Sequence, residues 1–120
     1  MFRFSLLMLA AGLIHAQAPV QQAPAKENAR RNPFAGNKTA ERAGAKLFAR
    51  ECAQCHGENG RGGLGKAPPL RQPEVFAAPP GALFWVLRNG VLWRGMPSFA
   101  HLPEPQRWQI ITYLKSLGTT

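Results

Sequence analysis

The 120-residue sequence contains no aspartate, only two cysteines and few acidic residues of any kind. Six glutamates stand against 15 lysines and arginines, which gives a formal net charge of +9. Two cysteines are too few for a small scaffold held together by disulfides. The length suits one small domain and excludes a barrel enzyme or a doubly wound dinucleotide-binding enzyme. The charge is compatible with nucleic acid, a membrane surface or an acidic protein as partner.

The apolar run at the N-terminus is too short to cross a membrane. Residues 4–14 form a run of 11 residues with one polar member, whereas a helix needs about 20 to span a bilayer. The run follows Arg3 and precedes the small residues Ala16 and Ala18, which is the pattern of a secretory signal peptide. We therefore expect residues 1–16 to be a signal peptide, cleaved after Ala16 or alternatively after Ala18, and the protein to be exported to a periplasm.

Residues 17–38 are rich in glutamine, alanine and proline and contain few large apolar side chains. Such a composition buries little surface, so we expect a flexible tail ahead of a folded domain at 39–120. Arg30 and Arg31 are expected to be solvated in this tail. Phe34 is a candidate to dock onto the domain.

Three segments of the domain have apolar residues at helical spacing. The first is predicted to begin with Thr39 as its N-cap. The second covers about 81–88 and is predicted to end at Asn89 and Gly90. The third begins near Pro105, since proline suits the first turn of a helix. The apolar face of the first segment consists of Ala40, Gly44, Leu47, Phe48 and Cys52, and that of the third of Ile110, Tyr113, Leu114 and Leu117.

A long segment without periodicity separates the first two helical segments. Residues 57–80 hold five glycines and five prolines. A loop of this length is uncommon in a compact domain unless it has a binding role, and an 82-residue domain with three helices has a thin core. The sequence therefore indicates that an apolar ligand completes the core.

The first helical segment ends in Cys52-Ala-Gln-Cys55-His56, and C-x-x-C-H is the signature of covalent haem c attachment. Two thiols one turn apart can form thioethers with the two vinyl groups of a porphyrin, and the adjacent imidazole can then bind the iron. A thioredoxin-type pair would need a βαβ context, and a zinc site would need further ligands. A structural disulfide would not need the histidine. We therefore predict one covalent haem c, attached at Cys52 and Cys55, with His56 as an iron ligand.

Met96 is the only methionine outside the predicted signal peptide. It lies between Gly95 and Pro97, 40 residues after His56, which is enough chain to reach the opposite face of the haem. We predict that Met96 is the second axial ligand. His101 is the rival ligand, although a surface position in the loop is the expected one for it.

These motifs resemble the monohaem class I cytochromes c, particularly small bacterial periplasmic ones, over about residues 40–118. The resemblance implies an all-α fold of three to five helices wrapped around one covalent haem. Gly44 and Phe48 match the glycine and aromatic residue that precede the first cysteine of the family by eight and four residues. Ile110 and Tyr113 match the pair on the last helix that crosses this glycine.

The same resemblance assigns two further parts of the site. Pro68 matches the family's proline whose carbonyl accepts a hydrogen bond from the ligand histidine, and residues 95–97 match the loop of the methionine ligand. Together these features imply a soluble periplasmic one-electron carrier with a six-coordinate His/Met haem, and no enzymatic activity. The alternatives are a haem subunit bound permanently to a periplasmic dehydrogenase or oxidase, and a ligand-sensing or redox-sensing cytochrome from which Met96 dissociates.

The net charge of the domain indicates which kind of partner it binds. Residues 39–120 contain ten basic and five acidic residues, a balance of +5. Opposite charge accelerates short-lived encounters, so we expect redox partners with an acidic docking surface. Nucleic acid is the poorest partner, because the basic residues are scattered through the domain and export separates the protein from nucleic acid. Stable membrane insertion is not expected either. Trp93 and Arg94 are candidates to pair with a haem propionate.

Overall fold

The computed structural model describes residues 18–119, so the predicted signal peptide at 1–16 lies outside the described residues. Within this range the chain is helical, with an isolated bridge between Val91 and Met96 and no strand. None of the helices in this range is long and apolar enough to cross a membrane. The elements in chain order are η1 (Pro19–Gln22), α1 (Ala25–Asn28), α2 (Lys38–Glu51), α3 (Ala53–His56), η2 (Glu58–Gly60), α4 (Pro73–Phe76), α5 (Pro80–Asn89), η3 (Leu92–Arg94) and α6 (Glu104–Leu117).

The three longest helices, α2, α5 and α6, occupy the three segments predicted from periodicity. α5 ends at the cap residue Gly90, as predicted, and α6 ends at the cap residue Gly118. The cap of α2 differs from the prediction. Asn37, not Thr39, is the N-cap, because its side-chain oxygen accepts a 2.9 Å hydrogen bond from the backbone N–H of Ala40. Thr39 therefore lies in the first turn.

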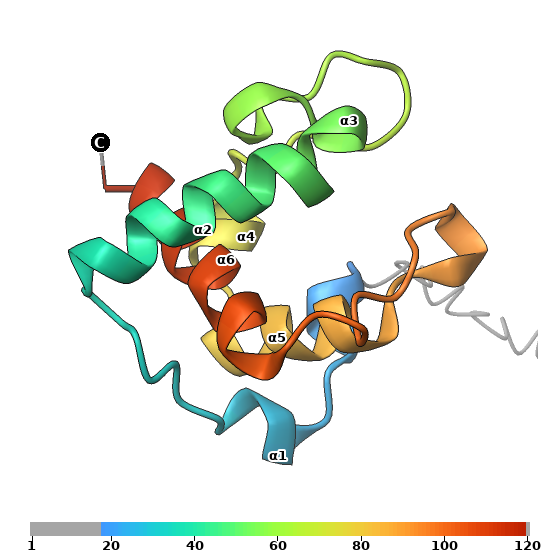
Figure 1. Ribbon diagram of the computed structural model, residues 1–120. Coiled ribbons are helices and arrows are strands. Elements are labelled where there is room, and N and C mark those ends of the chain that lie inside the picture. The colour runs from blue at the N-terminus through green and yellow to red at the C-terminus, as the bar shows by residue number, and fades with distance from the viewer. Residues whose placement is uncertain (1–17, 120) are drawn as a thin grey trace, which may run out of the picture.

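Helices α2 and α6 cross at Gly44 (Figure 1). A Cβ atom at Gly44 would lie 1.9 Å from the backbone oxygen of Gln109 and 2.9 Å from the Cβ atom of Tyr113, so only glycine allows this approach. Next to the crossing, the rings of Phe48 and Tyr113 pack with centroids 5.4 Å apart. Ile110 is fully buried beside them. The crossing that the family resemblance implied is present.

The core lies between α2, α5 and α6. The rings of Phe84 on α5 and Trp108 on α6 stack with centroids 4.0 Å apart. Burial of such side chains stabilises a fold by about 1.5–3 kcal/mol each. The buried members of the core are Leu47, Phe48, Cys52, Val75, Ala78, Leu83, Phe84, Leu87, Phe99, Leu102, Trp108, Ile110, Ile111, Tyr113 and Leu114.

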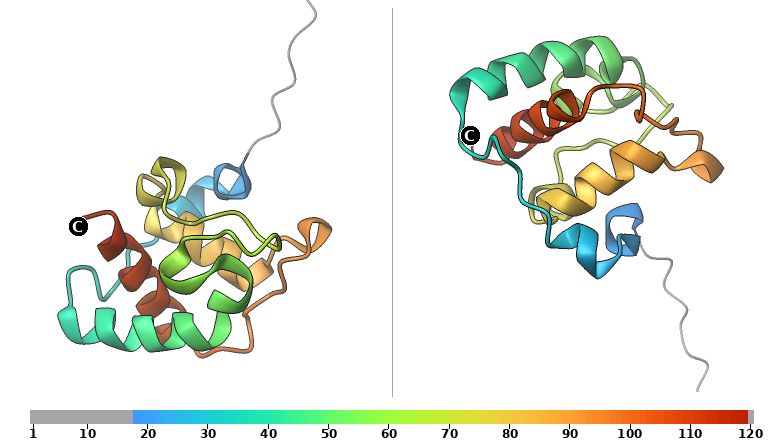
Figure 2. Two further views of the ribbon diagram at one scale, coloured as in Figure 1. Left: turned by 90° about the horizontal axis from the view of Figure 1, so that it is seen from above. Right: turned by 60° about the horizontal axis from the view of Figure 1, so that its bottom comes forward.

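Residues 18–37, for which a flexible tail was expected, are packed against α5 and α6 instead. Both η1 and α1 contact α5, as Figure 2 shows for the blue segment. Ala23 and Glu27 are buried, and Arg30, expected to be solvated, is half-buried. Phe34 packs partly buried against the core, as expected. Composition is misleading here because small and charged side chains, Ala23, Glu27 and Arg30, also take part in this packing.

Candidate haem site

The two cysteines lie at the junction of α2 and α3. Cys52 is the C-cap residue of α2 and the N-cap residue of α3. Its carbonyl oxygen accepts hydrogen bonds from the N–H groups of Cys55 at 3.2 Å and His56 at 3.0 Å. Neither cysteine forms a disulfide. One helical turn therefore presents two free thiols and an imidazole.

The electrostatic environment of Cys52 distinguishes this pair from a redox-active one. Burial, together with the charges of Glu51 and Cys55, raises the pKa of the Cys52 thiol to about 12. The thiol is protonated at neutral pH, whereas the attacking thiol of a thioredoxin-type pair has a lowered pKa. Among residues 18–119, no three His, Cys, Asp or Glu side chains gather in a way that could hold a metal ion. The structure thus lends no support to the thioredoxin and zinc alternatives.

The ring of His56 is oriented by Pro68. Nδ1 of His56 lies 2.9 Å from the carbonyl oxygen of Pro68. A carbonyl only accepts, so Nδ1 carries the proton and donates, and Nε2 keeps the lone pair that can bind iron. The loop that carries Pro68 is closed by two short backbone hydrogen bonds, from the N–H of Gly62 to His56 at 2.6 Å and from that of Leu70 to Gly60 at 2.8 Å.

A second set of contacts ties this loop to α6. The sequence did not predict them. The hydroxyl of Tyr113 donates a 2.7 Å hydrogen bond to Oδ1 of Asn59, and Nε of Arg71 donates to the backbone oxygen of Asn59 at 2.9 Å. Burial raises the pKa of Tyr113, so its hydroxyl remains a donor. Asn59 has a φ of +55°, a conformation that asparagine tolerates. The Asn59-Gly60 pair is the sequence signal for this turn.

Met96 lies in the loop between η3 and α6, partly buried against the core. Its backbone pairs with Val91 in both directions, at 3.0 and 3.1 Å. Figure 1 shows this loop, in orange, on the same side of the molecule as α3 and the loop that follows α3. His101 is exposed, with its ring centroid 6.0 Å from that of Phe99, which is the surface position expected for it.

The loops on this side present large apolar side chains to the exterior. Leu64, Leu92 and Trp93 are 53%, 72% and 68% exposed, and the guanidinium of Arg94 lies 4.4 Å from the centre of the Trp93 ring. Exposed apolar groups on neighbouring loops are typical of a surface that meets a ligand or a partner. Two free thiols, an imidazole of fixed tautomer, a thioether side chain and apolar loops together fit haem c.

The domain matches a known protein family. A model of the family described as "Cytochrome C oxidase, cbb3-type, subunit III" matches residues 39–114. This range includes both cysteines, His56, Pro68 and Met96, and it begins after the packed segment 18–37. No curated protein matches the chain.

Proposed function

The chain belongs to the family of cytochrome c oxidase, cbb3-type, subunit III, and on this premise we propose that it is a periplasmic one-electron carrier. Membership makes it a c-type cytochrome of the class I all-α fold, with covalently bound haem c, and hence an electron-transfer protein. When bound, haem c supplies an iron centre that accepts and releases one electron between Fe(III) and Fe(II).

The Cys52–His56 turn holds the cofactor in this proposal. Cys52 and Cys55 would hold the haem through two thioether bonds, one to each vinyl group, with each S–H adding across a vinyl double bond so that no atom would be released. Nε2 of His56 would bind the iron, and the carbonyl of Pro68 fixes the plane and tautomer of the ring. The observation that carries the proposal is the 2.9 Å contact between His56 and Pro68, one turn from two free thiols.

Met96 would be the second protein ligand of the iron in this proposal. Its loop is anchored by the two hydrogen bonds with Val91 and lies on the same side of the molecule as α3. Ligation by a methionine and a histidine would raise the reduction potential relative to two histidines, and an iron held by both side chains would favour electron transfer over substrate binding. The alternative sensor, in which Met96 dissociates, predicts a ferrous protein that binds carbon monoxide readily.

The positive charges on this side of the molecule suit redox partners with an acidic surface. Arg61, Lys66 and Arg94 lie exposed on its two loops, and within residues 18–119 none of the three forms an ion pair. Unpaired cations beside apolar side chains steer an acidic partner without a large permanent interface.

A redox titration of the visible spectrum of the exported protein tests the proposed function. We expect one reversible one-electron transition with haem c bands, in a ferrous form that does not react with carbon monoxide. A protein without covalent haem, or one that binds carbon monoxide at once, would contradict the proposal.

The family description favours a second candidate. It names an oxidase subunit, so the chain is also a candidate haem subunit bound permanently to a periplasmic oxidase. Purification of the exported protein at physiological salt distinguishes the two. A carrier is recovered as a free small protein, whereas a subunit is recovered with the larger enzyme.

A further inference from the structure

One face of α5 is covered by the segment 18–37. Gly81, Phe84 and Arg88 recur at i, i+3 and i+7 and so share this face. A Cβ atom at Gly81 would lie 1.7 Å from the backbone oxygen of Glu27, so α5 and the segment touch backbone to backbone. The segment therefore packs onto α5 at a site shaped for it.

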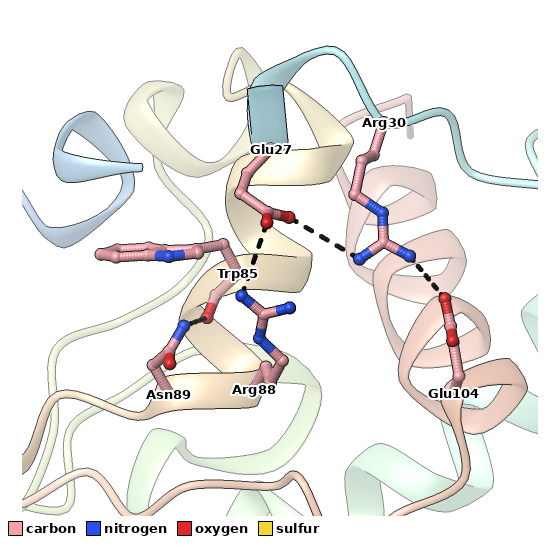
Figure 3. A network of polar contacts seen from close by, with 6 residues as sticks. All are labelled: Glu27, Arg30, Trp85, Arg88, Asn89 and Glu104. Carbon is pink, nitrogen blue, oxygen red and sulfur yellow. Dashed lines mark hydrogen bonds and ion pairs between the residues drawn. The ribbon is translucent and has the colours of Figure 1, made fainter. Parts of the chain in front are cut away.

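Charged groups hold the segment in place (Figure 3). The carboxylate of Glu27, which is 7% exposed, pairs with Arg88 at 3.5 Å and with Arg30 at 3.6 Å. Arg30 in turn pairs with Glu104 on α6 at 2.5 Å, and its guanidinium lies 4.4 Å from the centre of the Phe84 ring. Glu27 thus joins the segment to α5 directly and to α6 through Arg30.

The end of α5 to which Glu27 binds also anchors the loop of Met96. The carbonyl oxygen of Arg88 accepts a hydrogen bond from the hydroxyl of Ser98, and that of Leu87 accepts one from the N–H of Phe99 at 2.7 Å. Arg88 therefore contacts Glu27 with its side chain and the Met96 loop with its backbone.

We propose that residues 18–37 are a brace that fixes α5 and, through it, the Met96 loop, with Glu27 as its positioning residue. The effect on the iron rests on the proposed ligation by Met96. The segment lies outside the range of the family match, residues 39–114. A loosened brace gives Met96 more freedom to leave the iron, because its loop is then held at fewer points.

Glu27→Gln removes the charge while keeping the shape of the side chain. Glu41→Gln is the matched control, since Glu41 also forms an ion pair, with Lys38 at 3.2 Å, but on α2. The first readout is hydrogen exchange at the amides of Met96 and Phe99. The second is the affinity of the ferric protein for imidazole, which competes with Met96. We expect Glu27→Gln to increase both by about fivefold or more, and the control to change neither.

Equal exchange rates in the two variants would overturn the brace. Faster exchange in Glu27→Gln with unchanged imidazole affinity would overturn its action on Met96. A wild-type ferric protein without a methionine–iron band would contradict the proposed ligation instead, and hydrogen exchange alone would then decide the brace. If Glu27→Gln does not fold, Asn32→Ala replaces it, because this change removes the 2.9 Å hydrogen bond from the brace to Thr112 on α6.

Discussion

The hydroxyl of Tyr113 donates a 2.7 Å hydrogen bond to the side chain of Asn59, three residues beyond His56. The backbone oxygen of Asn59 also accepts from Arg71, which lies three residues after Pro68. The last helix therefore holds Asn59, and Asn59 joins the two ends of the loop that orients His56.

Tyr113→Phe should lower the free energy of unfolding by about 1 kcal/mol at neutral pH, because it removes this hydrogen bond and keeps the ring against Phe48. Urea unfolding measures the loss. Asn59→Gly removes the acceptor at a position whose φ of +55° glycine tolerates. The double variant should lose less than the two single losses together, and strictly additive losses would show that the two side chains do not interact.

The same contact predicts a pH dependence. Burial raises the pKa of Tyr113 in the folded state above its ordinary value of about 10. At higher pH the unfolded chain loses this proton before the folded protein does. The stability that Tyr113 contributes is therefore complete below pH 10 and is lost as the pH rises through the folded pKa. The difference between wild type and Tyr113→Phe should shrink in that range, and a difference that grows there would contradict this reasoning.

Gly44→Ala tests the crossing of α2 and α6. Helix propensity alone favours alanine by about 1 kcal/mol. The new Cβ would lie 1.9 Å from the backbone oxygen of Gln109, so the helices must separate, and we expect a net loss of about 1–3 kcal/mol. Ala49→Gly, at an exposed position of the same helix, measures propensity without a crossing. A Gly44→Ala variant more stable than wild type would contradict the close approach.

The sequence predicted those features that depend on local pattern. C-x-x-C-H has a fixed spacing because the chemistry demands it, and α2, α5 and α6 show their apolar faces directly. The crossing at Gly44 followed from the family resemblance. These features can be predicted without knowing which distant residues are in contact, apart from the contacts that the family shares.

The features that escaped prediction depend on contacts between distant residues. Residues 17–38 were expected to be a tail because they contain few large apolar side chains. The burial of Glu27 depends on its pairing with Arg88, and that of Arg30 on its pairing with Glu104. The N-cap of α2 also escaped prediction. Asparagine and threonine both cap helices, and the path of the chain into α2 places Asn37, not Thr39, in the capping position.

The charge around the site should govern reaction rates with small charged oxidants. We expect the rate of oxidation by ferricyanide to fall as salt rises, and the rate with a cationic cobalt complex to rise, because ions screen exposed charges beyond about 10 Å at 0.1 M. Arg94→Gln should weaken both trends, whereas Arg42→Gln on α2 should not. Reaction rates that do not change with ionic strength would show that this surface does not steer partners.

Covalent attachment predicts that colour stays with the polypeptide after acid-acetone extraction of the unfolded protein. Cys52→Ser and Cys55→Ser should each leave a single thioether or none, which shifts the haem bands. Haem that moves into the solvent from the wild-type protein would contradict attachment at these cysteines.

The far-red spectrum of the oxidised protein tests the central assignment, His56 and Met96 on one iron, most directly. The account predicts a weak iron–sulfur charge-transfer band in the wild type that Met96→Ala abolishes and His101→Ala leaves intact, with a lower reduction potential in Met96→Ala only. The opposite pattern, with no band in the wild type and a potential that responds to His101→Ala, would contradict it.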